Sequence, residues 1–195
     1  MARIARIERK TSETDISVQL NLDGNGSYHI SSSIPFFDHM LILFSAHGFF
    51  DLDIKATGDV EIDTHHTVED IGIALGDAVT DALSDRKGIT RYGYAVTPMD
   101  ETLATVAIDL SNRPFLVYNV PEKVFAKGSF DLYVAKEFFR AFSNRSGMNL
   151  HINVPYGENE HHMVEAIFKS FGRALSQAVA SNKRVKSIRS TKGVL

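Results

Sequence analysis

Residues 65–83 read HHTVEDIGIALGDAVTDAL, and residues 161–179 read HHMVEAIFKSFGRALSQAV. Each stretch begins with two adjacent histidines, has a glutamate three positions after the second histidine, and continues with apolar residues at helical spacing. The apolar stripe of the first stretch consists of Val68, Ile71, Leu75, Ala78, Val79 and Ala82. This spacing predicts two amphipathic helices, each starting with the motif HHxxE.

The two helical stretches belong to an internal repeat. A shift of 96 residues aligns the HHxxE segments, and a shift of 98 aligns Leu52 and Ile54 with Leu150 and Ile152. Residues 14–34 alternate around a DGNG turn and predict a β-hairpin. Residues 34–48, with Pro35 as a start signal and Gly48 as a stop signal, predict a helix, and residues 49–58 predict a strand. Strand-like segments 102–111, 113–120 and 148–155 and a helical segment 131–147 continue the same order in the second half.

The expected fold is therefore α+β, built from duplicated β-β-α-β-α units as a two-layer α/β sandwich. Helices should pack on one face of mostly antiparallel sheets. We expect a single domain over residues 1–195, with pseudo-repeats at about 10–86 and 90–182 and a basic C-terminal tail at 183–195.

Composition narrows the class of protein. The chain has 195 residues, 44% of them hydrophobic and 23% charged, and no apolar run long enough to cross a membrane. Cysteine is absent, which excludes a disulfide-stapled secreted fold and favours the cytoplasm. A net charge of −3 gives no field for binding nucleic acid. The basic tail is expected to be a solvated end unless it holds an anion, and its cations are Lys183, Arg184, Lys186, Arg189 and Lys192.

Histidines next to carboxylates predict a transition-metal site. The shift of 98 places His39, in PFFDHML, opposite Glu137, and both side chains can bind a metal. The repeat thus predicts two equivalent groups of four ligands. The first group is His39, His65, His66 and Glu69, and the second is Glu137, His161, His162 and Glu165.

Helix geometry limits what each HHxxE can do. Adjacent residues on a helix lie about 100° apart, so two neighbouring histidines cannot easily serve one ion. We expect each motif to serve two different metals, and an interface between chains would allow this. One copy alone would be read as a polar helix start, whereas two copies at matching positions favour a metal site with positions left open for substrate. Imidazole and carboxylate ligands favour manganese or iron over magnesium.

Other polar residues have ordinary explanations. Arg91 and Arg113 lie at element ends and gain interest only if the substrate carries a phosphate. Lys169 is spaced to pair with Glu165, and the alternative is that it lines the metal pocket. His47 suits the C-terminal dipole of its helix, and two strand histidines are interpreted as structural, His29 and His151.

Several longer segments resemble one family. PFFDHML, DTHHTVEDIGIALG, PMDETLATVAIDLSNRPF, SGMNLHI, ENEHHMVEAIFKSFGRAL and the terminal STKGVL are similar to the monofunctional form of imidazoleglycerol-phosphate dehydratase, over essentially the whole chain. The resemblance implies two Mn²⁺ ions per active site and an assembly of twenty-four subunits with active sites between them. Position 137 is histidine in some members and glutamate in others. The implied metal ligands are His39, His65, His66, Glu69, His161, His162 and Glu165, and the internal repeat independently supports Glu137 as a ligand. The implied substrate contacts are Glu13, His47, Arg91, Arg113, Lys169, Ser190, Thr191 and Lys192.

The implied reaction is the dehydration of imidazole glycerol phosphate to imidazole acetol phosphate in histidine biosynthesis. The hydrogen to be lost is not acidic, so we expect a metal-bound imidazolate to expel hydroxide and form a diazafulvene-like species first. Glu13 is expected to move the proton and Lys169 to protonate or steady the leaving oxygen. Two alternatives stay open: a dinuclear metal hydrolase of a phosphorylated small molecule, and a structural cage joined by metals.

Overall fold

The computed structural model describes residues 3–121 and 132–195. The first repeat contains β1 (Ile4–Lys10), β2 (Thr14–Asn21), β3 (Tyr28–Ser31), α1 (Pro35–Gly48), β4 (Asp51–Gly58) and α2 (His65–Leu83). The second contains β5 (Tyr92–Met99), β6 (Thr102–Asp109), β7 (Phe115–Asn119), α3 (Leu132–Ser146), β8 (Asn149–Tyr156) and α4 (Glu160–Val179). Asp131, at the start of a predicted helical segment, lies outside the described residues.

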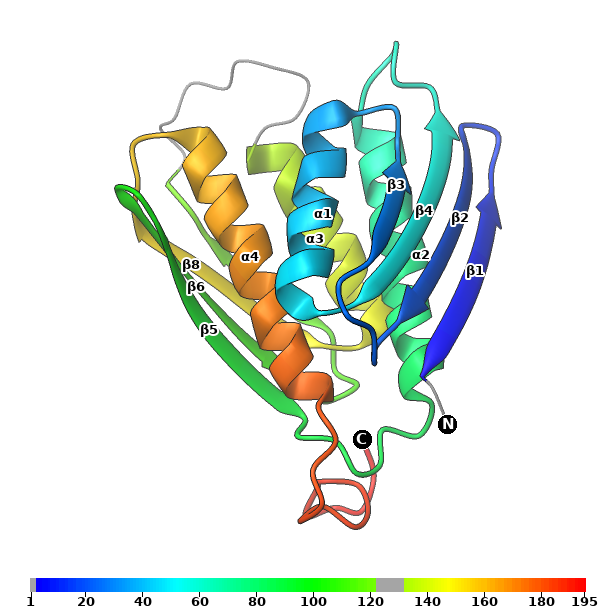
Figure 1. Ribbon diagram of the computed structural model, residues 1–195, viewed down its shortest axis with the longest axis vertical. Helices are drawn as coiled ribbons and strands as arrows, with labels where there is room; N and C mark the ends of the chain where they lie inside the picture. Colours follow the sequence, from blue (N-terminus) through cyan, green and yellow to red (C-terminus); the bar gives the residue numbers. More distant parts are fainter. Residues whose placement is uncertain (1–2, 122–131) are drawn as a thin grey trace.

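The two repeats have the same topology. Their strand orders are β1-β2-β4-β3 and β5-β6-β8-β7. In each sheet the first two pairings are antiparallel, and the last, β3 with β4 or β7 with β8, is parallel. The helices lie between the two sheets, so each sheet has helices on one face only (Figure 1). The predicted duplicated α+β fold with mostly antiparallel sheets is confirmed.

Two details of the prediction are wrong. β1 and β5 were not predicted, so each unit has one strand more than expected. The DGNG segment also does not close a hairpin, because β2 pairs with β4 and β3 pairs with the far side of β4. The Asp51 side chain explains this path: its Oδ1 accepts hydrogen bonds from the backbone N–H groups of Asn25 (2.9 Å) and Ser27 (3.2 Å). The segment is thereby bound to the start of β4.

Phenylalanine rings fill the space between the helices. Phe44 of α1 stacks on Phe171 of α4 with ring centroids 5.2 Å apart, and α3 contributes Phe138, which stacks on Phe168 at 5.4 Å. α1 packs on α4 and α2 on α3, so both helix pairs join one repeat to the other. Close approach needs glycine: a Cβ on Gly172 would lie 2.5 Å from the carbonyl oxygen of Phe44. Among the described residues, no helix is long and apolar enough to cross a membrane.

Candidate active site

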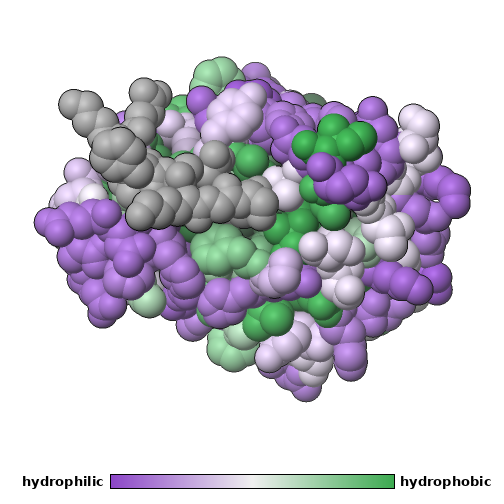
Figure 2. Space-filling view, turned by 90° about the horizontal axis from the view of Figure 1, so that it is seen from above, coloured by the Kyte–Doolittle hydropathy of each residue, from purple (hydrophilic) through white to green (hydrophobic). Residues whose placement is uncertain are grey.

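Both HHxxE motifs form the first turns of their helices. The α4 motif is fixed by its N-cap, since the Asn159 side chain accepts a hydrogen bond from the backbone N–H of His161 at 3.0 Å. In α2 the Asp63 side chain accepts from the backbone N–H of His65 at 2.9 Å. The helices begin at one end of the molecule, where hydrophilic side chains predominate around the rim with apolar ones between them (Figures 1 and 2).

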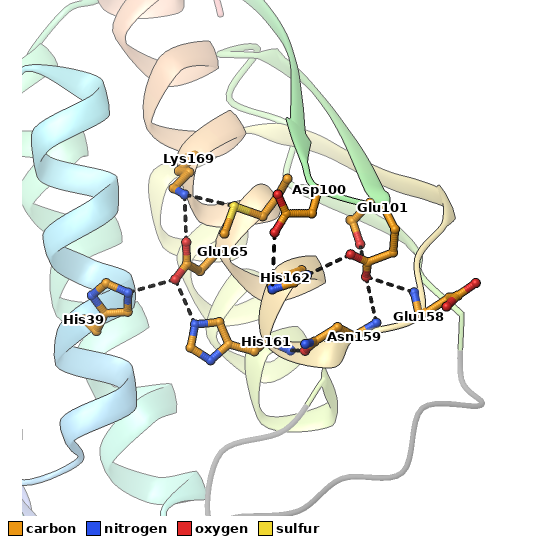
Figure 3. A network of polar contacts seen from close by, with 11 residues as sticks. His39, Asp100, Glu101, Glu158, Asn159, His161, His162, Glu165 and Lys169 are labelled. Carbon is orange, nitrogen blue, oxygen red and sulfur yellow. Dashed lines mark hydrogen bonds and ion pairs between the residues drawn. The ribbon is translucent and has the colours of Figure 1, made fainter.

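Glu165 is the centre of the first cluster (Figure 3). Its Oε1 lies 2.9 Å from His39 Nε2 and 2.8 Å from His161 Nε2, and its Oε2 accepts from Lys169 Nζ at 2.7 Å. Burial of this side chain alone would raise its pKa, but the bonds from Lys169, His39 and His161 lower the pKa to about 2. One ligand atom from each of His39, His161 and Glu165 lies within 4.8 Å of the others. These three atoms lie close enough together that they could bind one small cation.

The cluster joins residues of both repeats. The repeat groups His39 with the HHxxE of its own half, whereas the structure places His39 beside His161 and Glu165, because α1 packs on α4. By the same arrangement α3 packs on α2, where Tyr133 lies against His65 with ring centroids 6.1 Å apart. The clustering of side chains from both repeats follows from helix pairing, which the linear order of residues does not reveal.

Glu137 lies on α3, on the helix that faces the first HHxxE. Glu137 is only 5% exposed, and its Oε2 accepts a hydrogen bond from Arg140 Nη1 at 2.6 Å. Its Oε1 is buried and has no hydrogen-bond partner within the described residues. On α2, His65 Nε2 and Glu69 Oε2 lie 3.2 Å apart. A buried carboxylate oxygen without a partner is costly, and a bound cation would satisfy it.

The second histidine of each motif turns away from the first, as helix geometry predicts. His161 Nε2 faces Glu165 and His65 Nε2 faces Glu69, whereas His162 and His66 face other carboxylates, Glu101 and Asp59. His162 Nδ1 lies 2.8 Å from Glu101 Oε2 (Figure 3), and this bond raises the pKa of His162. The same bond is the main reason that the pKa of Glu101 falls to about 2.

In the first repeat the equivalent ring is held by an aspartate. His66 Nδ1 lies 3.0 Å from Asp59 Oδ2, which raises the pKa of His66, and 3.8 Å from Glu13 Oε2. Glu13 and Asp59 line one surface hollow. Asp59 and Glu101 were missed in the sequence, although Glu101 lies 88 positions after Glu13 and the two glutamates directly precede the second strand of their sheets.

The predicted phosphate contacts line a separate cavity. Its volume is about 650 Å³, and its polar lining includes Arg91, Ser111, Arg113, Arg189, Ser190, Thr191 and Lys192. Arg91 holds the tail in place, since Nε donates to Asp109 Oδ1 at 2.6 Å and Nη1 to the carbonyl oxygen of Arg189 at 2.6 Å. The bond with Asp109 raises the pKa of Arg91. Arg189 was not among the predicted site residues, although its cluster of basic neighbours was noted.

This cavity lies far from the histidines of the same chain. The backbone N–H of Arg91 donates to the carbonyl oxygen of Ala178, at the end of α4, whereas His161 lies in the first turn. The 17 residue steps from His161 to Ala178 span roughly 25 Å along the helix axis, at about 1.5 Å per residue. The tail and the histidines accordingly lie at opposite ends of the molecule (Figure 1).

His47 lies between these regions, in the last turn of α1. Burial is the main cause that lowers its pKa, and the positive charges of Lys169 and Arg173 lower it further. His29 and His151 both lie on strands with exposed side chains, away from the cluster around Glu165. The contact of His47 with substrate stays a prediction.

Comparison with known proteins decides the family. The family model described as imidazoleglycerol-phosphate dehydratase matches residues 32–175. The chain belongs to the imidazoleglycerol-phosphate dehydratase family. Proteins of that name from Desulfosudis oleivorans and Geobacter sulfurreducens are 58% and 55% identical to it over 195 residues, which is 100% of both chains in each case.

Solved dehydratase structures have the same fold. The imidazoleglycerol-phosphate dehydratase from Staphylococcus aureus is 38% identical, with a TM-score of 0.82, and the match covers 92% of this chain and 99% of that one. The enzyme from Pyrococcus furiosus, solved in complex with (S)-C348, is also 38% identical, with a TM-score of 0.85 and coverage of 97% and 100%. The activity is therefore that of a hydro-lyase that dehydrates imidazole glycerol phosphate in histidine biosynthesis. A hydrolase and an inactive cage are not supported.

Proposed function

We propose that this dehydratase works with two Mn²⁺ ions per active site. The convergence of His39, His161 and Glu165 is the observation that carries the proposal, because their ligand atoms lie within 4.8 Å of one another. Imidazole nitrogen with carboxylate oxygen suits manganese better than magnesium or calcium, which prefer oxygen alone.

We place the second ion at the other helix pair, although within the described residues only His39, His161 and Glu165 bring their ligand atoms within 4.8 Å of one another. Its proposed ligands are His65 and Glu69 on α2 and Glu137 on α3, whose buried Oε1 has no partner in the described part of the chain. His66 and His162 are the remaining proposed ligands. Their side chains face Asp59 and Glu101 and not the partners of the first histidines, so each would reach an ion other than the one served by its neighbour.

The bound metals would supply Lewis-acid stabilisation of negative charge on the imidazole ring of the substrate. The chain supplies proton transfer. Glu13 has a side chain that is 51% exposed and 3.8 Å from His66, which suits a carboxylate that takes a proton from the substrate carbon. Lys169, which donates to Glu165 at 2.7 Å, would give a proton to the departing hydroxyl oxygen or steady it.

We further propose that active sites form between subunits of a homo-oligomer of twenty-four chains. A three-carbon chain between an imidazole ring and a phosphate spans on the order of 10 Å, given bonds of about 1.5 Å. The histidines and the basic cavity of one chain are more than twice as far apart. Arg113, Lys192 and their neighbours would therefore hold the phosphate of a substrate whose ring lies at the histidines of another chain. A biosynthetic step of this kind belongs in the cytoplasm.

Glu13→Gln and Lys169→Met test the proton-transfer roles. Both variants should lose about 10²- to 10⁴-fold in kcat, the usual contribution of a positioned acid or base. Manganese content should stay at the wild-type level, because neither residue is a proposed ligand. Steady-state kinetics on imidazole glycerol phosphate and metal analysis of the same samples measure the two effects. Near-normal turnover with both metals bound would overturn the roles, while loss of metal together with turnover would reassign these residues to the metal site.

A further inference from the structure

The second histidine of each HHxxE is hydrogen-bonded through Nδ1, and the Nε2 atom of His162 lies 3.7 Å from Asp100 Oδ2, beyond hydrogen-bond distance. His162 Nδ1 lies 2.8 Å from Glu101 Oε2, and His66 Nδ1 lies 3.0 Å from Asp59 Oδ2. An ionised carboxylate only accepts hydrogen bonds, so Nδ1 must carry the proton. In the neutral ring Nε2 then has a free lone pair.

Glu101 is itself firmly anchored. Its Oε1 accepts from the backbone N–H groups of Asn159 at 2.8 Å and Glu158 at 3.2 Å, and from the Thr102 hydroxyl at 3.2 Å (Figure 3). One carboxylate thereby ties the β5–β6 turn to the loop before α4 and to the His162 ring. Such a carboxylate fixes the orientation of the ring as well as its tautomer.

In the first repeat a different residue holds the second histidine: Asp59 bonds to His66, although Glu13 is the repeat equivalent of Glu101. Glu13 is the repeat equivalent of Glu101, because each directly precedes the second strand of its sheet, at Thr14 or Thr102. Yet Glu13 Oε2 is 3.8 Å from His66 Nδ1, beyond hydrogen-bond distance, and Asp59 makes the bond instead. The Asp59 side chain is 18% exposed, whereas that of Glu13 is 51% exposed.

We propose that Glu101 is a positioning residue for His162, that Asp59 has this role for His66, and that the use of Asp59 frees Glu13 for another role. The two glutamates of the repeat have thus diverged, one into a structural support and the other into a free carboxylate beside the site. The consequence for metal binding rests on the proposed function, in which Nε2 of each ring is the ligand atom.

Glu101→Gln is a nearly isosteric test. The carbonyl oxygen of the new side chain can keep the bonds to the loop, while its NH₂ group then faces His162 and donates to Nδ1. The neutral His162 ring should change to the tautomer with hydrogen on Nε2. Solid-state ¹⁵N spectra of histidine-labelled, metal-free protein at alkaline pH report this change, with His162→Gln to assign the signal. Manganese affinity should fall by about 10- to 100-fold, the usual effect of losing such a carboxylate.

The repeat supplies matched controls. Glu13→Gln makes the same chemical change at the equivalent position and should leave the His66 tautomer and manganese affinity unaltered. Asp59→Asn should switch the His66 tautomer. The proposal is overturned if wild-type His162 carries its hydrogen on Nε2, which needs no variant, or if Glu13→Gln changes His66 as Asp59→Asn does. A tautomer switch in a protein whose wild type binds no manganese would support the positioning role and contradict the proposed metal function.

Discussion

Replacing His161 by alanine is expected to remove one of two bound manganese ions and to lower kcat roughly a thousandfold. A catalytic metal supplies several kcal/mol of charge stabilisation in the transition state, and each 1.36 kcal/mol is a factor of ten in rate, so the loss is of that order. His161 shares Glu165 Oε1 with His39, so the ion loses one of three converging ligands. Metal analysis and turnover on imidazole glycerol phosphate measure both effects.

His39, which contacts the same Glu165 oxygen as His161, allows a stricter test of the prediction. His39→Ala should have the same effect, and the double variant of His39 and His161 should be little worse than either single variant, because both residues hold the same ion. His29→Ala is the matched control, since this histidine has a side chain that is 87% exposed on β3. Full metal content and normal turnover in His161→Ala would remove His161 from the ligand set. Additive losses in the double variant would show that His39 and His161 do not hold the same ion.

Two inactive variants should restore activity when their subunits are mixed. His161→Ala damages the histidine end of each chain, and Arg113→Ala damages the phosphate end. If each site takes one end from each of two chains, random mixing leaves about a quarter of the sites intact. Arg113 is preferred to Arg91, which is buried against Asp109 and holds the tail. Turnover after co-expression, with the size of the assembly checked, is the measurement.

The subunit-mixing experiment also has an outcome that would contradict the proposal of sites between subunits. Activity no greater than the sum of the two variants, in an assembly that contains both chains, would mean that one chain provides a whole site. The geometry argues against this, because Arg91 lies at the end of α4 and His161 in its first turn, roughly 25 Å away.

Much of this fold could be predicted because its apolar pattern is strong. All six residues of the α2 stripe are buried, and the 96-residue shift between the HHxxE motifs revealed the duplication before any contact was known. β5 was missed for a physical reason. Its inward residues are small, because a Cβ on Gly93 would lie 1.8 Å from the carbonyl oxygen of Ala174, while its larger residues Tyr92 and Tyr94 face outward. The usual alternation is therefore inverted.

β1 was missed because it is an edge strand with a weak pattern. Ala5 is its one buried residue, so burial imposes little alternation on the strand. The DGNG hairpin failed for another reason, since Asp51 captures the turn and places β3 beyond β4. The hairpin error thus comes from strand pairing that depends on a residue distant in sequence, whereas the β1 error comes from a weak local pattern.

The candidate site could be predicted in its residue types but not in its grouping. The different directions of adjacent histidines follow from helix geometry, and in the structure adjacent histidines contact different carboxylates. The pairing of His39 with His161 and Glu165 depends on α1 packing against α4, which joins the two repeats. Glu101 escaped notice because a lone glutamate carries no motif, although its repeat equivalent Glu13 was singled out.

Manganese content and turnover before and after chelation test the central claim most directly. The purified enzyme should contain about two manganese ions per active site, lose turnover on imidazole glycerol phosphate when the metal is removed, and recover it when manganese is returned. The same chelation of His161→Ala should release less metal. Full turnover in protein shown by elemental analysis to hold no metal would contradict the account.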